Sequence, residues 1–181
     1  MKKTLIIIGA VVVIGAIILI GKLPGSKPAV VIAPTISTYE ECTAAGNAIL
    51  ESYPEQCRTT DGRIFVRDIG NELEKQSLII ASYPRPGDTV ASPLTITGTA
   101  RGYWYFEATF PVKMLDKNGA VIGAHYAQAQ GEWMTEDFVP FTSTLTFQAV
   151  SGEHGTLVLQ KDNPSGLPEN DDELRIPIIF N

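Results

Sequence analysis

The chain of 181 residues is long enough for one domain of ordinary size and some shorter segments. Its formal net charge is −6, and all 20 acidic residues lie at or after Glu40, where the sequence contains ten Lys and Arg residues. A surface of this sign repels phosphate groups, which proteins bind through Lys and Arg. Nucleic acid and a bare anionic membrane surface are therefore excluded as partners.

An uncharged apolar run lies near the start of the chain. Leu5–Gly21 contains 17 uncharged residues, and Lys2, Lys3 and Lys22 flank it. About 17–25 apolar residues span a bilayer, and no small-residue cleavage pattern or lipobox cysteine follows the run. We therefore predict a transmembrane anchor over residues 1–21, with a cleaved signal peptide as the alternative.

A proline-rich stretch follows the apolar run. Residues 22–38 contain Pro24, Pro28 and Pro34 and no acidic residue. Prolines at this density favour an extended, semi-rigid chain. The stretch is interpreted as a linker.

The two cysteines, Cys42 and Cys57, lie in the next segment, residues 39–77. No metal-type ligands accompany them, so their simplest interpretation is a disulfide, which needs an oxidising compartment. A segment this short buries too little apolar surface to be stable alone. We predict a small Cys-stapled module and a single-pass protein of the cell membrane whose C-terminal domain is extracytoplasmic.

Apolar and polar residues alternate from Leu78 onward. In 104–114 every even position is apolar, and the same period of two recurs in 94–100 and 144–149. This alternation indicates strands with one buried face and one wetted face. Further strands are predicted at 78–83, 120–129, 156–161 and 174–180. About seven short strands within 78–181 predict an all-β fold, an immunoglobulin-like β-sandwich.

Four stretches of the β region have a more specific sequence. They are SPL to GTA over 92–100, WYFEATFPV over 104–112, GEWM with FVPF over 131–141, and GTL to DNPS over 155–165. With them, residues 78–181 resemble the immunoglobulin-like domain associated with bacterial spore germination proteins. The resemblance implies a sandwich at the cell surface with a binding or scaffolding role, and it implies no enzyme.

Residues suited to catalysis are few. The chain has two histidines, His125 and His154, and contains no nucleophile elbow, no H-E-x-x-H and no P-loop. Glu107 lies in the most apolar predicted strand, on the face opposite the core, and is interpreted as a structural carboxylate, with a ligand contact as the alternative. No catalytic residue and no cofactor are predicted.

The two tryptophans have different predicted environments. Trp104 shares the apolar face of its strand and is predicted to lie in the core, whereas Trp133 lies in a polar loop. Trp133 either folds back over the end of the sandwich or is exposed as a carbohydrate platform.

Strands that alternate in direction bring the loops around 101–103, 130–140 and 162–173 to one end of the sandwich. Recognition in such folds is usually placed on irregular loops, so we predict that a partner binds there. The candidate binding residues are Arg101, Tyr103, Trp133, Met134, Glu136 and Asp137. A weaker calcium candidate consists of Asp162, Asp171, Asp172 and Glu173, and no other metal site is expected.

These observations predict a non-enzymatic, membrane-anchored envelope protein whose sandwich binds a protein, a wall polymer or a glycan. One alternative is a structural assembly module of an envelope complex. A second is an envelope hydrolase, which would require one of the histidines to lie beside a nucleophile and a carboxylate.

Overall fold

The computed structural model describes residues 35–181. Within this range no helix is long and apolar enough to cross a membrane. The predicted anchor over 1–21 and nearly all of the linker over 22–38 lie outside the described residues. Residues 36–181 form one compact unit.

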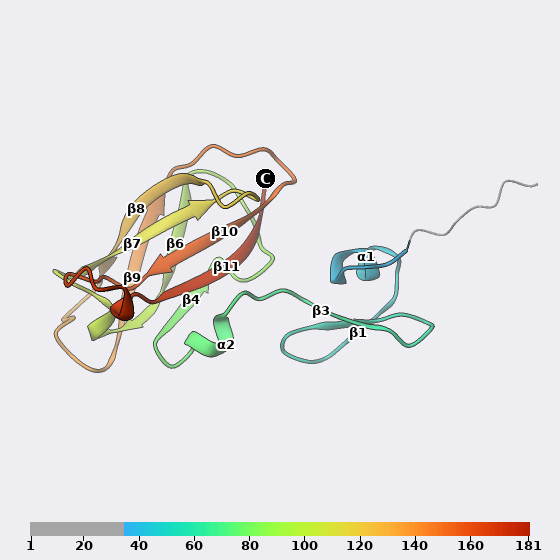
Figure 1. The fold of residues 1–181 in the computed structure, drawn as a ribbon, viewed down its shortest axis with the longest axis horizontal. Helices are drawn as coiled ribbons and strands as arrows, with labels where there is room; N and C mark the ends of the chain where they lie inside the picture. Colours follow the sequence, from blue (N-terminus) through green and yellow to red (C-terminus); the bar gives the residue numbers. More distant parts are fainter. Residues whose placement is uncertain (1–34) are drawn as a thin grey trace, which may run out of the picture. The chain divides into compact units, whose positions relative to one another are not determined.

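The described part is mostly β (Figure 1). Its first segment contains α1 (Tyr39–Ala44), β1 (Ala48–Leu50), β2 (Gln56–Arg58), β3 (Ile64–Val66) and α2 (Glu72–Lys75). The sandwich contains β4 (Ile79–Tyr83), β5 (Thr89–Val90), β6 (Leu94–Arg101), β7 (Thr109–Leu115), β8 (Val121–Ala129), β9 (Phe138–Leu145), β10 (His154–Gln160) and β11 (Glu173–Phe180). Two short 3-10 helices lie at Gly102–Trp104 and Pro168–Asn170.

The eight sandwich strands pair in the order β4-β6-β9-β8-β7-β10-β11-β5. All pairs are antiparallel except β11 with β5, which is parallel. β8 pairs with β7 over most of its length and with β9 at Gln128 and Ala129 alone, so it joins two facing layers at a corner. The layers are β4-β6-β9 and β8-β7-β10-β11-β5. The eighth strand, β5, is the one that the sequence did not predict.

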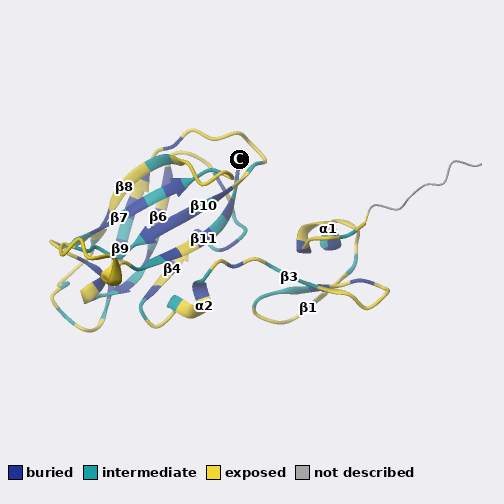
Figure 2. Ribbon diagram, in the orientation of Figure 1, coloured by how far each residue is buried: buried dark blue, intermediate teal, exposed yellow. Residues whose placement is uncertain are grey.

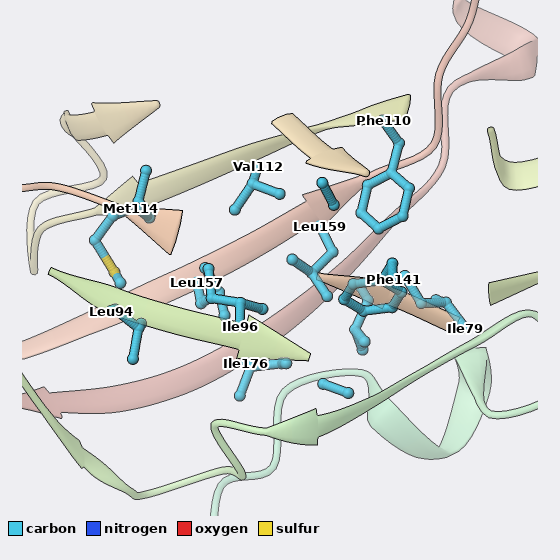
Figure 3. Close-up of a cluster of buried hydrophobic side chains, with 14 of the residues drawn as sticks. Ile79, Leu94, Ile96, Phe110, Val112, Met114, Phe141, Leu157, Leu159 and Ile176 are labelled. Atoms are coloured by element: carbon cyan, nitrogen blue, oxygen red, sulfur yellow. The ribbon is translucent and has the colours of Figure 1, made fainter. Parts of the chain in front are cut away.

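The core lies between the two layers (Figures 2 and 3). Ile96 from β6, Phe141 from β9 and Phe110 from β7 are buried, and the rings of Phe110 and Phe141 meet edge to face with centroids 5.0 Å apart. Aromatic pairs favour this geometry. The predicted alternation explains the core well, because the inward side chains of β6, β7, β9 and β11 occupy every second position.

One predicted strand, 104–114, is too long by five residues. β7 begins at Thr109, after a 3-10 helix and a tight turn in which Glu107 has φ 49° and Ala108 has φ 63°. Glu107 therefore lies at the tip of a turn and not on a sheet face, and Phe106 is exposed. The alternation over 104–108 was a coincidence of composition, because a turn places apolar residues without regard to a period of two.

A second strand was predicted too far along the chain. The strand expected over 144–149 is β9, which covers Phe138–Leu145, and 146–149 contains no strand residues. Phe147 is nevertheless buried, because the backbone N–H of Phe147 donates to the Ser92 hydroxyl (3.0 Å) and so holds the loop against the core. Burial of Leu145 and Phe147 at alternate positions produced the strand-like pattern.

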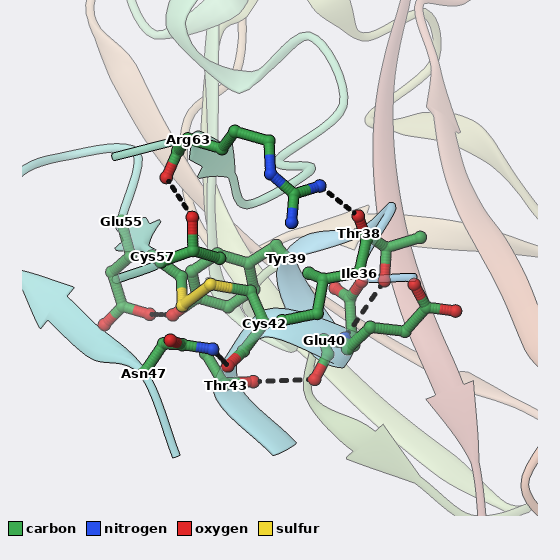
Figure 4. Close-up of a disulfide and its surroundings, with 12 residues drawn as sticks. Ile36, Thr38, Tyr39, Glu40, Cys42, Thr43, Asn47, Glu55, Cys57 and Arg63 are labelled. Carbon is green, nitrogen blue, oxygen red and sulfur yellow. Dashed lines mark hydrogen bonds between the residues drawn. A yellow bond between two sulfur atoms is a disulfide. The ribbon is translucent and has the colours of Figure 1, made fainter. Parts of the chain in front are cut away.

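The first segment is stapled by the predicted disulfide. Cys42 and Cys57 are bonded, with their Cα atoms 6.0 Å apart, and both are fully buried beside Tyr39 (Figure 4). The Tyr39 hydroxyl donates to Glu55 (2.8 Å), and the Arg67 guanidinium binds the same carboxylate (2.9 Å). The sulfur bridge therefore replaces a core that this segment is too short to build.

Residues 70 and 71, between β3 and α2, pack along the part of the β11 edge that β5 does not cover. The side-chain amide of Asn71 donates to the Glu173 carbonyl (2.9 Å) and its oxygen accepts from the Arg175 N–H (2.8 Å). Gly70 fits beside β11 because it lacks a Cβ, which would lie 1.9 Å from the Arg175 carbonyl oxygen. These contacts cover an edge that would otherwise be open to pairing with another chain.

Candidate functional site

Three loops meet at one end of the sandwich. The register of the strands places 101–108, 130–137 and 161–172 together, because Arg101 pairs with Phe138 and Gln160 pairs with Glu173. The loops 84–93, 116–120 and 146–153 lie at the other end, where Leu94 pairs with Leu145. We call these the acidic end and the opposite end.

Backbone hydrogen bonds tie the three loops of the acidic end together. The Gly102 N–H donates to the Asp137 carbonyl (3.1 Å), and the Asp162 N–H donates to the Trp104 carbonyl (3.0 Å). A Cβ on Gly102 would lie 1.9 Å from the Thr135 carbonyl oxygen, so glycine is needed for this approach. The loop 101–108 is therefore clamped between the other two, and the end is a preorganised surface.

Arg101 holds two loops in place and is not free to bind a partner. Its guanidinium lies 4.1 Å from the ring centroid of Phe138 and donates to the carbonyls of Ser77 (3.1 Å) and Glu136 (3.1 Å). Stacking on a ring and binding of carbonyls are typical structural roles of arginine. We interpret Arg101 as a positioning residue.

The tryptophans are placed as the sequence favoured. Trp104 is fully buried in the core, although it lies in the 3-10 helix and not in a strand. Trp133 is half-buried and packs against the same core, so it folds back over the end of the sandwich. The Nε1–H of Trp104 has no hydrogen-bond partner among the described residues.

The side chains that remain accessible at the acidic end are apolar, acidic, or neutral and polar, the last including Gln130, Ser165 and Asn170. Met134 is 74% exposed, Tyr103 is 51% exposed, and the predicted residues Glu136 and Asp137 are exposed beside them. Two further exposed apolar residues, Phe106 and Leu167, were not predicted as binding residues. Phe106 was assigned to the inward face of a strand, and Leu167 has no signal apart from its position in a polar loop.

Charge is distributed unequally between the two ends. The loops of the acidic end contain eight carboxylates and two basic residues, whereas those of the opposite end contain three carboxylates and two basic residues. Burial and the neighbouring charge of Glu107 raise the pKa of the Asp162 carboxyl above its ordinary value. The carboxylates of Glu107 and Asp162 are therefore near enough for the charge of one to affect the other.

The calcium candidate is not assembled. Asp172 forms an ion pair with Lys75 (2.6 Å), Glu173 forms one with Arg175 (2.6 Å), and Asp171 accepts from the Asn163 amide (2.7 Å). Across residues 35–181 no three acidic, histidine or cysteine side chains are grouped to hold a metal. Three of the four acidic residues, Asp171, Asp172 and Glu173, bind local partners instead of converging on one point.

The histidines lie far from any arrangement that would activate a nucleophile. His125 is exposed on β8, and His154 lines an open groove of 420 Å³ at the opposite end together with Asp68, Asp116 and Arg175. In the part of the chain that the structure describes, neither imidazole makes a hydrogen bond to a hydroxyl or a carboxylate. A general base with an adjacent nucleophile, which the hydrolase alternative requires, is not formed in this range.

The chain reaches the sandwich at the opposite end. The Arg67 guanidinium lies against Gly87, and Tyr39 and Glu40 line a pocket with Gly87 and His154. The segment 67–75 then runs along β11 to Asp172, which Lys75 binds at the acidic end. β4 then begins at the acidic end, where Ile79 pairs with Ala100 and the Arg101 N–H donates to the Leu78 carbonyl (2.8 Å). The chain therefore first contacts the sandwich at the opposite end and enters its first strand at the acidic end.

The two facing layers of mainly antiparallel strands, with β5 paired in parallel to β11, define this domain as an immunoglobulin-like β-sandwich. Residues 79–167 match the family model described as the immunoglobulin-like domain of bacterial spore germination, and the domain belongs to this family. The predicted resemblance is confirmed. This family is not a known enzyme family. Comparisons with curated proteins and with solved structures found no match.

Proposed function

We propose that this protein is a non-enzymatic binding module of the cell envelope and that the acidic end contacts its partner. The observation that supports this proposal most directly is the arrangement of three loops that backbone hydrogen bonds hold together on a rigid scaffold. These loops expose Tyr103 and Met134 among carboxylates. Loops on a rigid sandwich are a common location for recognition, and preorganised loops lose less entropy on binding.

The location of the protein is part of the proposal. The uncharged run Leu5–Gly21 has the length of a membrane anchor, and the buried Cys42–Cys57 disulfide fits an oxidising compartment. The protein is then a single-pass membrane protein with the sandwich outside the cytoplasm, where a protein, a wall polymer or a glycan is within reach.

A second candidate function is assembly of an envelope complex through β8. A register shift between Met114 and Leu115 turns Val121 to the same outer face as Tyr126, and both are more than half exposed. Exposed apolar groups on one face of a sheet are typical of contacts between proteins. This function uses a sheet face, whereas the leading proposal uses loops, so the two are separable by experiment.

Site-specific photo-crosslinking in cells tests both functions. A photoreactive residue replaces Met134 at the acidic end, Tyr126 on β8 or Val150 at the opposite end, all of which are exposed. The proposal predicts adducts of defined mass from position 134 and none from position 150. Adducts from position 126 alone would support the assembly function, and adducts from position 150 alone would overturn the choice of end.

A further inference from the structure

Beside neutral polar groups such as Gln130 and Asn170, the acidic end exposes apolar side chains and carboxylates. Four large apolar residues are exposed there, one or two from each loop: Tyr103, Phe106, Met134 and Leu167. The eight carboxylates of the same loops are Glu107, Glu132, Glu136, Asp137, Asp162, Glu169, Asp171 and Asp172. In residues 35–181, Asp172 is the one member of this set that an ion pair neutralises.

The basic residues of these loops do not balance that charge. Arg101 is occupied by the Phe138 ring and two backbone carbonyls, and neither it nor Lys161 forms an ion pair within the described residues. The pKa of Asp162 is raised by burial and by Glu107, which means that a cation placed beside these carboxylates would relieve repulsion already present. The field of the acidic end attracts positive charge and would speed the approach of a cationic partner.

The acidic end of a second copy does not fit this surface. Two acidic ends brought together would place like charges opposite each other, which costs free energy. A sugar polymer stacks mainly on flat aromatic rings, and at this surface the rings of Tyr103 and Phe106 share the exposed apolar area with the non-aromatic Met134 and Leu167. Met134 and Leu167 are flexible or aliphatic and suit contact with apolar side chains, and methionine in particular adapts to varied peptide surfaces.

We infer that the acidic end binds a cationic, amphipathic segment of another protein, whose Lys or Arg side chains meet the carboxylates and whose apolar side chains cover Met134, Tyr103 and Leu167. This inference rests on the proposed function and specifies its partner. The free energy of binding then has two independent contributions, an electrostatic one that salt weakens and an apolar one that salt does not weaken.

The test titrates the full-length chain, in non-ionic detergent, with synthetic probe peptides. The first probe alternates Lys with Leu, the second alternates Lys with Ser, and the third alternates Glu with Leu; a soluble amino-polysaccharide is the fourth. The Lys-Leu peptide should bind at least about tenfold more tightly than the other three, because it alone supplies both parts. Equal binding of the Lys-Ser peptide or of the polysaccharide would overturn the inference.

Variants locate the binding and separate its parts. Glu136→Lys with Glu169→Lys should weaken binding of the Lys-Leu peptide by about tenfold and reduce its salt dependence, since both residues are exposed and neither side chain is in an ion pair within residues 35–181. Met134→Gln should weaken it about fivefold, with the salt dependence unchanged. The matched control, Glu40→Lys with Glu51→Lys, changes two exposed acids outside the acidic end and should have no effect.

Failure of this inference is distinguishable from failure of the proposed function. Photo-crosslinks from position 134 combined with no preference for the Lys-Leu peptide would keep the function and overturn the partner class. Equal weakening by the two charge-reversal pairs would show non-specific attraction and would also overturn it. Absence of crosslinks from position 134 would overturn the function itself.

Discussion

Replacement of Trp104 by alanine should be among the most damaging single changes in the sandwich. Trp104 is fully buried and lies in the 3-10 helix that supports the acidic end. A tryptophan buries about 150–250 Å², and at about 25 cal/mol per Å² this area corresponds to roughly 4–6 kcal/mol. Core truncations of this size cost about 3–5 kcal/mol. We expect Trp104→Ala to lower the free energy of unfolding by about 3–5 kcal/mol.

Two companion variants sharpen this expectation. Trp133 is half-buried on the same core, so Trp133→Ala should cost roughly half as much, about 2 kcal/mol. Trp104→Phe removes an Nε1–H that lacks a partner, and such a buried donor itself costs about 1–3 kcal/mol. That gain offsets part of the lost ring volume, so Trp104→Phe should be much milder than Trp104→Ala.

Urea unfolding of residues 36–181, with the disulfide intact, measures these differences. Circular dichroism is the suitable signal because the variants lose tryptophan fluorescence. If Trp104→Ala and Trp133→Ala reduced the free energy of unfolding equally, the division of the two residues between core and rim would be wrong. A Trp104→Phe variant as unstable as Trp104→Ala would refute the role assigned to the unpartnered Nε1–H.

Three further outcomes are expected. Thiol titration of the denatured, unreduced protein should find no free cysteine, because Cys42 and Cys57 are bonded; two titratable thiols would contradict the pairing. Gly102→Ala should destabilise the acidic end, because a Cβ would meet the Thr135 and Trp133 carbonyl oxygens. The rate of amide hydrogen exchange in 130–137 should therefore rise. An unchanged rate would contradict the close contact of loop 101–108 with loop 130–137. Burial and the hydrogen bond to Glu72 raise the pKa of Tyr53 from 10.0 to about 12, so the folded state holds this proton more tightly than the unfolded state. This contribution to the free energy of unfolding should be full below pH 10 and should be lost between about pH 10 and 12. Tyr53→Phe should flatten that loss, and an unaltered slope would exclude Tyr53 as its source.

The sequence predicted the sandwich because its strands are half-buried. In β6 and β11 the chain alternates inward and outward residues over eight positions each, which leaves a clear period of two in the sequence. The disulfide was equally accessible, since two cysteines in an exported segment leave a single pairing. β5 was missed because two residues cannot display a period.

The candidate site was predictable in outline and not in detail. Alternating strand directions were sufficient to bring 101–103, 130–140 and 162–173 to one end. The conformation of Glu107 and Ala108 was not foreseeable, because a positive φ at two successive non-glycine residues is set by the hydrogen bonds of the turn, where Phe106 and Thr109 bond to each other. The occupation of Arg101 by Phe138 and two carbonyls depends on tertiary contacts that no local pattern records.

The route of the chain along β11 also depends on tertiary contacts. Nothing in residues 67–75 predicts that Asn71 replaces a strand partner of β11. Residues 70–75 lie beside β11, from Gly70 against the Arg175 carbonyl to Lys75, which binds Asp172, before β4 begins at the acidic end.

Carboxyl footprinting tests the central claim, that the acidic end is the binding surface, most directly. The full-length chain is labelled at its carboxylates with a carbodiimide and an amine, once purified and once in native envelope membranes, and mass spectrometry measures each site. We expect Glu132, Glu136 and Glu169 at the acidic end to be labelled less in the membranes than in the purified protein, while exposed Glu51 is labelled equally in both. Equal labelling of the three acidic-end carboxylates in the two samples would contradict the account.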